Sequence, residues 1–278
     1  MAKEIFLTPR DLEFFEDLYD LVFLDVDYLQ KVIYKSSKAA IYRRMKGLEE
    51  HGYIKSSRLA IVDKAKPAGR SKNVFTLDSK GIEEVRQIFG DTKWDPRWTD
   101  GTPGHIYHCL EMANVYASFK IIENEEFGLK EWLNESRSQY RFAEGRDGQI
   151  KPDGMLIVRQ KASNGYAGVM MELERSKQRK DVSIGKLKRY NRYCELECFK
   201  IQESLSVDIK APRIVFISLK ENEMRNLILH TKDVDTSKTR GVLYTTMEKI
   251  LADPYGKIFL AKGSSDPEQL YGIADPRE

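Results

Sequence analysis

Acidic residues at two points of the chain have the types and spacing to bind a divalent cation. Pro152-Asp153 opens one short apolar run, and Glu172-Leu173-Glu174 closes another about twenty residues later. Carboxylates at the ends of adjacent strands can share Mg²⁺ or Mn²⁺, because these ions prefer oxygen ligands. A lysine two residues past the second acid would lie on the same strand face, where it could orient an attacking water or neutralise a phosphate. This is the chemistry of metal-dependent phosphodiester cleavage.

The expected lysine position is occupied by an acid, Glu174. Three crowded carboxylates raise one another's pKa unless a metal is bound. Between Arg175 and Arg192, eight Lys or Arg residues stand against Asp181 alone, so the segment could supply the missing cation or lie along phosphates. If the site is active, the metal ligands are Asp153 and Glu172, and the catalytic candidates are Asp153, Glu172, Glu174, Lys186 and Lys188.

The elements that would position these residues form an α/β layout. Apolar periodicity predicts a helix, three strands, a helix, a strand, a helix and a strand. In chain order the expected ranges are 105–124, 130–136, 153–158, 168–174, 182–195, 213–218, 222–230 and 242–245.

The first ninety residues predict a different domain. Thr8-Pro9 starts a first helix, a second follows Asp25, and a third opens at Ser36/Ser37 and ends at Gly52. Two strand candidates then flank a basic loop at 63–72, and a last helix runs to about residue 89. This order is that of a winged helix-turn-helix.

Composition also predicts the domain boundaries. The segment 90–104 contains three glycines and two prolines, which interrupt periodicity, and its two tryptophans suggest that it packs against something. We therefore expect a winged helix-turn-helix at 1–90, a linker at 91–104 and an α/β domain at 105–278, giving a chain that is α+β overall.

Charge in the first domain is strongly polarised. From Lys35 to Lys72 there are eleven Lys or Arg and three acids, whereas Pro9 to Asp27 contains seven acids and only Arg10. A basic face attracts the phosphate backbone, with salt-dependent affinity. The predicted duplex-DNA contacts on the third helix and the wing are Ser37, Lys38, Tyr42, Arg43, Lys46, Lys64, Lys66, Arg70 and Lys72. A solvated charged face or a protein-docking module is the open alternative.

Two resemblances accompany these patterns. The stretch SSKAAIYRRMKGLEEHGYIKSS resembles the recognition helix and first wing strand of many bacterial regulators. Pro-Asp followed by Glu-x-Glu resembles the motif of the restriction-endonuclease-like fold, with the departure at Glu174.

Together they resemble the replication-relaxation proteins of plasmids and other mobile elements, over about residues 5–230. The residues that match this family's pattern are His108, Asn114, Pro152, Asp153, Glu172, Glu174, Lys186 and Tyr190.

The resemblance implies a DNA-binding accessory or regulatory protein of plasmid or mobile-element replication or mobilisation. Because a fold does not imply its chemistry, we expect the nuclease-like domain to be degenerate. The alternatives are a Mg²⁺- or Mn²⁺-dependent endonuclease targeted by its winged helix, with Glu111 as an outer acid, and a transcriptional regulator acting through protein contacts. Expected partners are duplex DNA, a second copy of the chain and replication or relaxase proteins.

Composition excludes several other classes. The three cysteines lack zinc-site spacing, and no phosphate-binding glycine motif of a nucleotide site occurs. The N-terminus does not resemble a signal peptide, and no stretch approaches the ~18 apolar residues of a membrane span, so a cytoplasmic location is expected.

Overall fold

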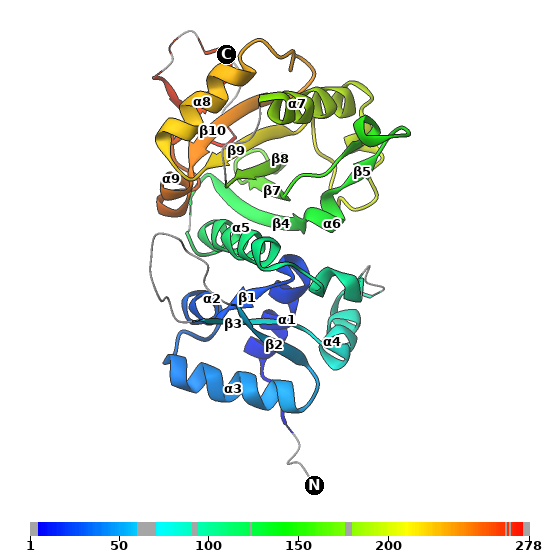
Figure 1. The fold of residues 1–278 in the computed structure, drawn as a ribbon, viewed down its shortest axis with the longest axis vertical. Coiled ribbons are helices and arrows are strands. Elements are labelled where there is room, and N and C mark those ends of the chain that lie inside the picture. The colour runs from blue at the N-terminus through cyan, green and yellow to red at the C-terminus, as the bar shows by residue number, and fades with distance from the viewer. Residues whose placement is uncertain are drawn as a thin grey trace. The chain divides into compact units, whose positions relative to one another are not determined.

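The computed structural model describes residues 5–59, 71–90, 94–122, 124–175, 180–264, 266 and 268–274. The chain divides into two compact units, Met1–Ala117 and Ser118–Glu278. The division falls within α5 (Pro103–Ile121), which therefore contributes residues to both (Figure 1).

The first unit consists of helices packed on a small antiparallel sheet. Its helical elements are α1 (Pro9–Leu21), α2 (Val26–Tyr28), the π-helical η1 (Leu29–Tyr34), α3 (Lys38–Glu50), α4 (Ser79–Phe89) and the 3₁₀ turn η2 (Pro96–Thr99). Its strands are β1 (Leu24–Asp25), β2 (Ile54–Leu59) and β3 (Lys72–Leu77), in the order β1-β3-β2. The predicted order of three helices, two strands and a helix is present.

Local signals explain where these helices begin and end. Thr8 and Asp11 form a capping box at the start of α1, which satisfies backbone N–H groups that the helix leaves unpaired. Lys35 adopts a left-handed conformation in the turn before α3. Gly52, with φ of +78°, reverses the chain after α3, where a side chain would be strained.

The segment that the sequence predicts as a linker packs on the first unit. The Trp94 side chain is buried, and its ring lies 6.2 Å from that of Tyr19 and 5.2 Å from that of Trp98. The expectation that these tryptophans pack is confirmed.

The second unit is built around a mixed seven-stranded sheet (Figure 1). The strands are β4 (Phe127–Asn134), β7 (Gly154–Gln160), β8 (Gly165–Glu174), β9 (Arg213–Ser218), β10 (Gly241–Thr246), β11 (Phe259–Ala261) and β12 (Leu270–Tyr271), in the order β12-β11-β10-β9-β8-β7-β4. The strands β8, β9 and β10 are mutually parallel, and the other neighbours are antiparallel. The mixed α/β class and the predicted order of helix, three strands, helix and strand are therefore observed.

Helices α7 (Lys180–Glu195) and α8 (Glu221–Thr231) share one hydrophobic core with this sheet. Leu187 and Tyr190 of α7 are buried with Met170 of β8 and Phe216 of β9. Alternate residues of a strand face the same side, so the side of β8 that carries Met170 also presents Glu172 and Glu174 to α7.

Short elements complete the second unit. Between β4 and β7 the chain forms α6 (Glu135–Ser138), a hairpin of β5 (Tyr140–Arg141) and β6 (Gln149–Ile150), and the 3₁₀ turn η3 (Arg146–Gly148). The remaining ones are η4 (Cys198–Lys200) and α9 (Met247–Ala252). Among the described residues, no helix is long and apolar enough to cross a membrane.

Candidate functional site

A cluster of carboxylates and one lysine lies where β8 meets α7. The Lys186 Nζ atom is 2.6 Å from Glu172 Oε2 and 3.1 Å from Glu174 Oε1. The Tyr190 hydroxyl donates a hydrogen bond to the other oxygen of Glu172. Lys186 and Tyr190 stand four apart and therefore lie on one face of α7. The cation missing from the strand is thus supplied by the following helix.

Burial dominates the electrostatics of this cluster. The Glu172 side chain is 1% exposed, and burial raises its pKa to about 7, against the opposing effect of Lys186. Burial also disfavours the charged form of Lys186, but its ion pairs with Glu172 and Glu174 prevail and raise the pKa of Lys186. Lys186 therefore stays protonated and is the fixed positive charge of the cluster.

Asp153 lies at the entrance to β7, beside this cluster. Its Oδ2 accepts a hydrogen bond from the backbone N–H of Leu173 at 2.7 Å, and its own N–H donates to the Met171 carbonyl at 3.0 Å. These bonds fix Asp153 against the end of β8. Its charge contributes to the raised pKa of Glu172, after burial.

Other predicted residues of the nuclease-like motif lie elsewhere. Lys188 is exposed, because a shift of two positions turns it away from the helix face that carries Lys186. His108 and Glu111 are half-buried on α5, and Asn114 is exposed there. Neither Lys188 nor these α5 residues line the pocket at Glu172.

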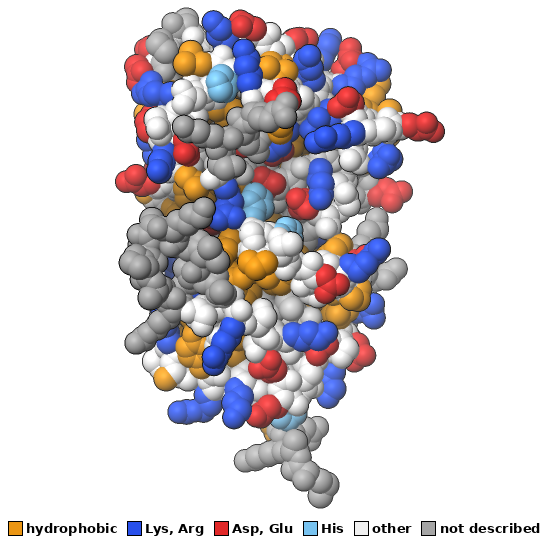
Figure 2. Space-filling view, viewed as in Figure 1, with side chains coloured by type: hydrophobic (Ala, Val, Ile, Leu, Met, Phe, Trp, Pro, Cys, Tyr) orange, Lys and Arg blue, Asp and Glu red, His pale blue; other side chains and the backbone are white. Residues whose placement is uncertain are grey.

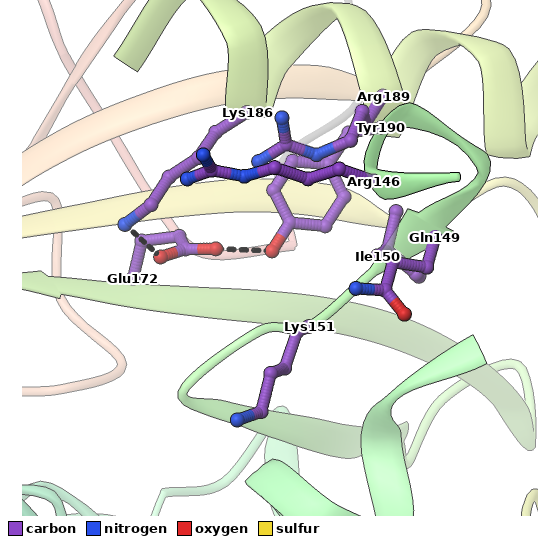
Figure 3. A pocket seen from close by; sticks show the side chains of 8 residues that line it. All are labelled: Arg146, Gln149, Ile150, Lys151, Glu172, Lys186, Arg189 and Tyr190. Carbon is purple, nitrogen blue, oxygen red and sulfur yellow. Dashed lines mark hydrogen bonds and ion pairs between the residues drawn. The ribbon is translucent and has the colours of Figure 1, made fainter. Parts of the chain in front are cut away.

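That pocket has a volume of about 180 Å³ (Figure 3). Its cationic lining comes from the β5–β6 hairpin, the residue after it and α7, and includes side chains that sequence analysis does not single out. The lining residues are Arg146, Gln149, Ile150, Lys151, Glu172, Lys186, Arg189 and Tyr190.

The arrangement does not fit the divalent cation that the motif implies. Both carboxylate oxygens of Glu172 are bound, one by Lys186 and one by Tyr190. Within the described ranges, no group of three or more His, Cys, Asp or Glu side chains is placed to hold a metal ion. The cluster is a pair of carboxylates that share one lysine amine.

A second candidate site is the exposed face of α3 in the first unit. Tyr42, Arg43 and Lys46 are exposed there, and Lys and Arg side chains gather over α3 (Figure 2). Arg43 forms no ion pair within the part of the chain that the structure describes. Lys46 makes one loose contact, 3.7 Å from Glu50. These charges face solvent and can be engaged by a ligand.

Two other predicted contact lysines are paired with acids. Lys38 pairs with Asp27, and Lys72 lies 2.8 Å from Asp25 and 3.1 Å from Asp27. Exposed or partly exposed pairs of this kind contribute little free energy, so a phosphate could compete for either lysine. Ser37 has a structural bond, because its side chain accepts from the Ala40 N–H and caps α3. Lys64, Lys66 and Arg70 lie outside the described residues.

Arg44 orients α3, although sequence analysis does not single it out. Its guanidinium donates to the two carboxylate oxygens of Asp11, whose side chain is buried, and to the Phe6 carbonyl. Asp11 also accepts from the Thr8 and Tyr34 hydroxyls. Although burial opposes it, these hydrogen bonds lower the pKa of Asp11. Arg44 thus ties α3 to α1 while its neighbour Arg43 faces solvent.

Strand β2 adds further exposed cations. Lys55 lies 3.3 Å from Asp78, and Arg58 is exposed. Glu49 at the end of α3 accepts hydrogen bonds from the Ser56 N–H and hydroxyl at 2.9 and 2.6 Å. These bonds hold the start of β2 against α3.

The fold and the two sites thus define a mixed α/β protein. In its second unit, two buried glutamates share an ion pair with one lysine. The family model for replication-relaxation matches residues 15–204, and the chain belongs to this family. No match is found among curated proteins.

Two solved structures show weak similarity. One is a structure of the restriction endonuclease FokI, with a TM-score of 0.32 and 16% sequence identity. The other is FokI bound to DNA, with a TM-score of 0.27 and 13% sequence identity. Each match covers 87% of this chain and 43% of the other, so this chain spans less than half the length of either structure.

Proposed function

We propose that this protein binds duplex DNA through the exposed face of α3, as an accessory or regulatory factor of plasmid or mobile-element replication or mobilisation. The proposal rests on the different surroundings of two adjacent arginines. Arg44 points inward and pairs with buried Asp11. Arg43 faces solvent beside Tyr42 and Lys46. A helix held in this way can present a rigid basic face to a major groove. Arg and Lys can read guanine there, and Tyr can hold phosphate.

Strands β2 and β3 would form the wing of this winged helix. Exposed Lys55 and Arg58 would contact the neighbouring backbone, whose phosphates bind cations irrespective of sequence. Because each phosphate contact releases counterions, the affinity should fall steeply as salt rises.

The second unit is proposed to be a degenerate nuclease-like scaffold. Lys186 is bound to both Glu172 and Glu174, so the acids that would have to hold a divalent cation already share an amine. The scaffold can still contribute a second DNA or protein contact. A homodimer is part of the proposal, because a symmetric pair doubles the base pairs that one winged helix reads.

The experiment compares duplex binding by the wild type and the double variant Arg43→Ala/Lys46→Ala over a range of salt concentrations. Loss of two cations from the proposed DNA-binding face should weaken binding and flatten its salt dependence. The control is Lys232→Ala/Lys257→Ala, which removes the same charge from exposed positions of the second unit. Equal affinity and slope in wild type and α3 variant would exclude α3 as the DNA-binding helix.

A further inference from the structure

The lining of the pocket beside Glu172 contains more cations than carboxylates. Four of its lining side chains are cations, Arg146, Lys151, Lys186 and Arg189, whereas Glu172 is the single carboxylate among them. Lys186 is committed to Glu172 and Glu174. The other three cations therefore determine what the pocket can bind.

These three cations have weak or exchangeable partners. Arg146 forms no ion pair within the described ranges. Arg189 lies 3.5 Å from Asp147, which is itself 92% exposed, although the Arg189 side chain is only 21% exposed. Lys151 pairs with Glu135 at 2.8 Å, at the surface. Of the three, Arg189 is half-buried whereas Arg146 and Lys151 are exposed, and a partly desolvated cation with a weak partner favours an anion beside it.

The directions of approach favour a tetrahedral anion. Arg146 comes from η3 in the β5–β6 hairpin, Lys151 follows β6, and Arg189 comes from α7. In Figure 3 the Arg146 and Arg189 side chains both extend toward the Lys186–Glu172 pair, whereas the Lys151 side chain extends away from it. A phosphate offers oxygens in several directions and more than one negative charge, whereas a carboxylate is planar and carries one.

From these contacts we infer that the pocket is a phosphate-binding site formed by Arg146 and Arg189, with no metal required. The pocket shares Glu172 with the acidic motif, but the proposed phosphate contacts Arg146 and Arg189 are neither the metal ligands that the motif implies nor part of the α3 surface. The phosphate can belong to a nucleic-acid backbone or to a small phosphorylated molecule, and the two sources are separable by experiment.

The test uses the full chain, the variant Arg146→Ala/Arg189→Ala and the matched control Lys188→Ala/Arg192→Ala, whose exposed residues lie on α7 but do not line the pocket. Binding of inorganic phosphate and of acetate is measured by calorimetry, and binding of a short duplex by fluorescence anisotropy. Thermal melting verifies that each variant folds. If the alanine variant does not fold, Arg146→Lys/Arg189→Lys replaces it in the binding measurements.

The expected result is that the pocket variant loses about tenfold or more in affinity for phosphate while the control does not, because two charge-assisted hydrogen-bonding groups are removed. An accompanying loss of duplex affinity identifies a backbone phosphate as the ligand. Unchanged duplex affinity identifies a small phosphorylated molecule.

Two results would overturn the inference. One is equal phosphate affinity in wild type and pocket variant, and the other is acetate binding as tight as phosphate. Binding of inorganic phosphate to the pocket does not depend on α3. The Arg43→Ala/Lys46→Ala variant tests DNA binding by α3 separately, so a negative result for one proposal leaves the other open to test.

Discussion

Adjacent arginines of α3 have opposite roles, and the difference is visible in helical spacing. Arg44 is three residues from Ile41 and four from Leu48, so it borders the buried stripe, whereas Arg43 lies farther from it. The charge pattern of the sequence predicts Arg43 as a DNA contact. It does not indicate that the neighbouring Arg44 has a structural role. The structural role of Arg44 depends on the burial of Asp11, a residue 33 positions away. No local pattern indicates that contact.

Replacement of Arg44 should therefore affect stability, and replacement of Arg43 should not. Arg44→Ala leaves the buried Asp11 carboxylate without its cation, which costs about 3 kcal/mol of unfolding free energy. Arg43→Ala should stay within about 0.5 kcal/mol of wild type, because the side chain is exposed. Urea denaturation of both variants measures the difference. Equal stabilities would show that the Arg44–Asp11 pair does not hold α3 in place.

Glu172 should make stability depend on pH. Burial raises its pKa from 4.5 to about 7, with Asp153 adding to the shift and Lys186 opposing it. Between these two pH values the folded chain retains a proton that the unfolded chain releases. The contribution of Glu172 to the free energy of unfolding therefore falls as pH rises through this window.

The variant Glu172→Gln isolates this effect, because glutamine does not titrate. Relative to wild type, the variant should gain stability as pH rises from about 4.5 to 7 and show no further relative change above that range. Denaturant melts of both proteins across this range provide the measurement. A constant difference between the two curves would mean that the pKa of Glu172 is not raised.

At the scale of elements, periodicity predicts the long helices and strands and misses the short ones. The strand Arg213–Ser218 matches its predicted range, and the predicted helix 182–195 corresponds to α7 at Lys180–Glu195. The hairpin of β5 and β6 was not predicted, because each strand has two residues and cannot show alternation. The prediction therefore missed Arg146, the pocket residue that the hairpin carries.

The orientation of α7 distinguishes Lys186 from Lys188, which the sequence offers equally as catalytic candidates. Lys186 shares a helix face with Tyr190 and contacts both acids, whereas Lys188 is exposed. The family resemblance places Lys186 in the motif through its spacing to Tyr190, and this spacing is the sequence signal that distinguishes the two.

Lys186→Met should destabilise the second unit, and Lys188→Met should not. The first change leaves Glu172 and Glu174 buried without their cation, at a cost of about 3 kcal/mol, whereas the second alters an exposed position by less than about 0.5 kcal/mol. Adding Glu172→Gln to Lys186→Met should recover part of the loss. Thermal and urea melts of the three variants give the comparison, and equal stability of the two single variants would contradict the ion-pair assignment.

At the scale of the whole molecule, family membership and fold class agree with expectations drawn from motif order. The sequence predicts a charge-polarised N-terminal domain followed by an α/β domain; the chain has two compact units that meet within α5, and the second contains the mixed seven-stranded sheet. The DNA site and the partners remain predictions, because they depend on surfaces rather than on periodic burial. Several predicted wing residues also lie outside the described part of the chain.

We propose that the protein binds duplex DNA and does not cleave it. The most direct test of this proposal is one incubation of wild-type protein with random and plasmid-origin duplexes at two salt concentrations, with Mg²⁺ and then Mn²⁺ added, scored for both binding and strand cleavage. We expect salt-dependent binding and intact DNA under either metal. Cleavage that disappears in Asp153→Ala or Glu172→Ala would contradict it and make the protein a nuclease, and absence of duplex binding at both salt concentrations would contradict the role of α3.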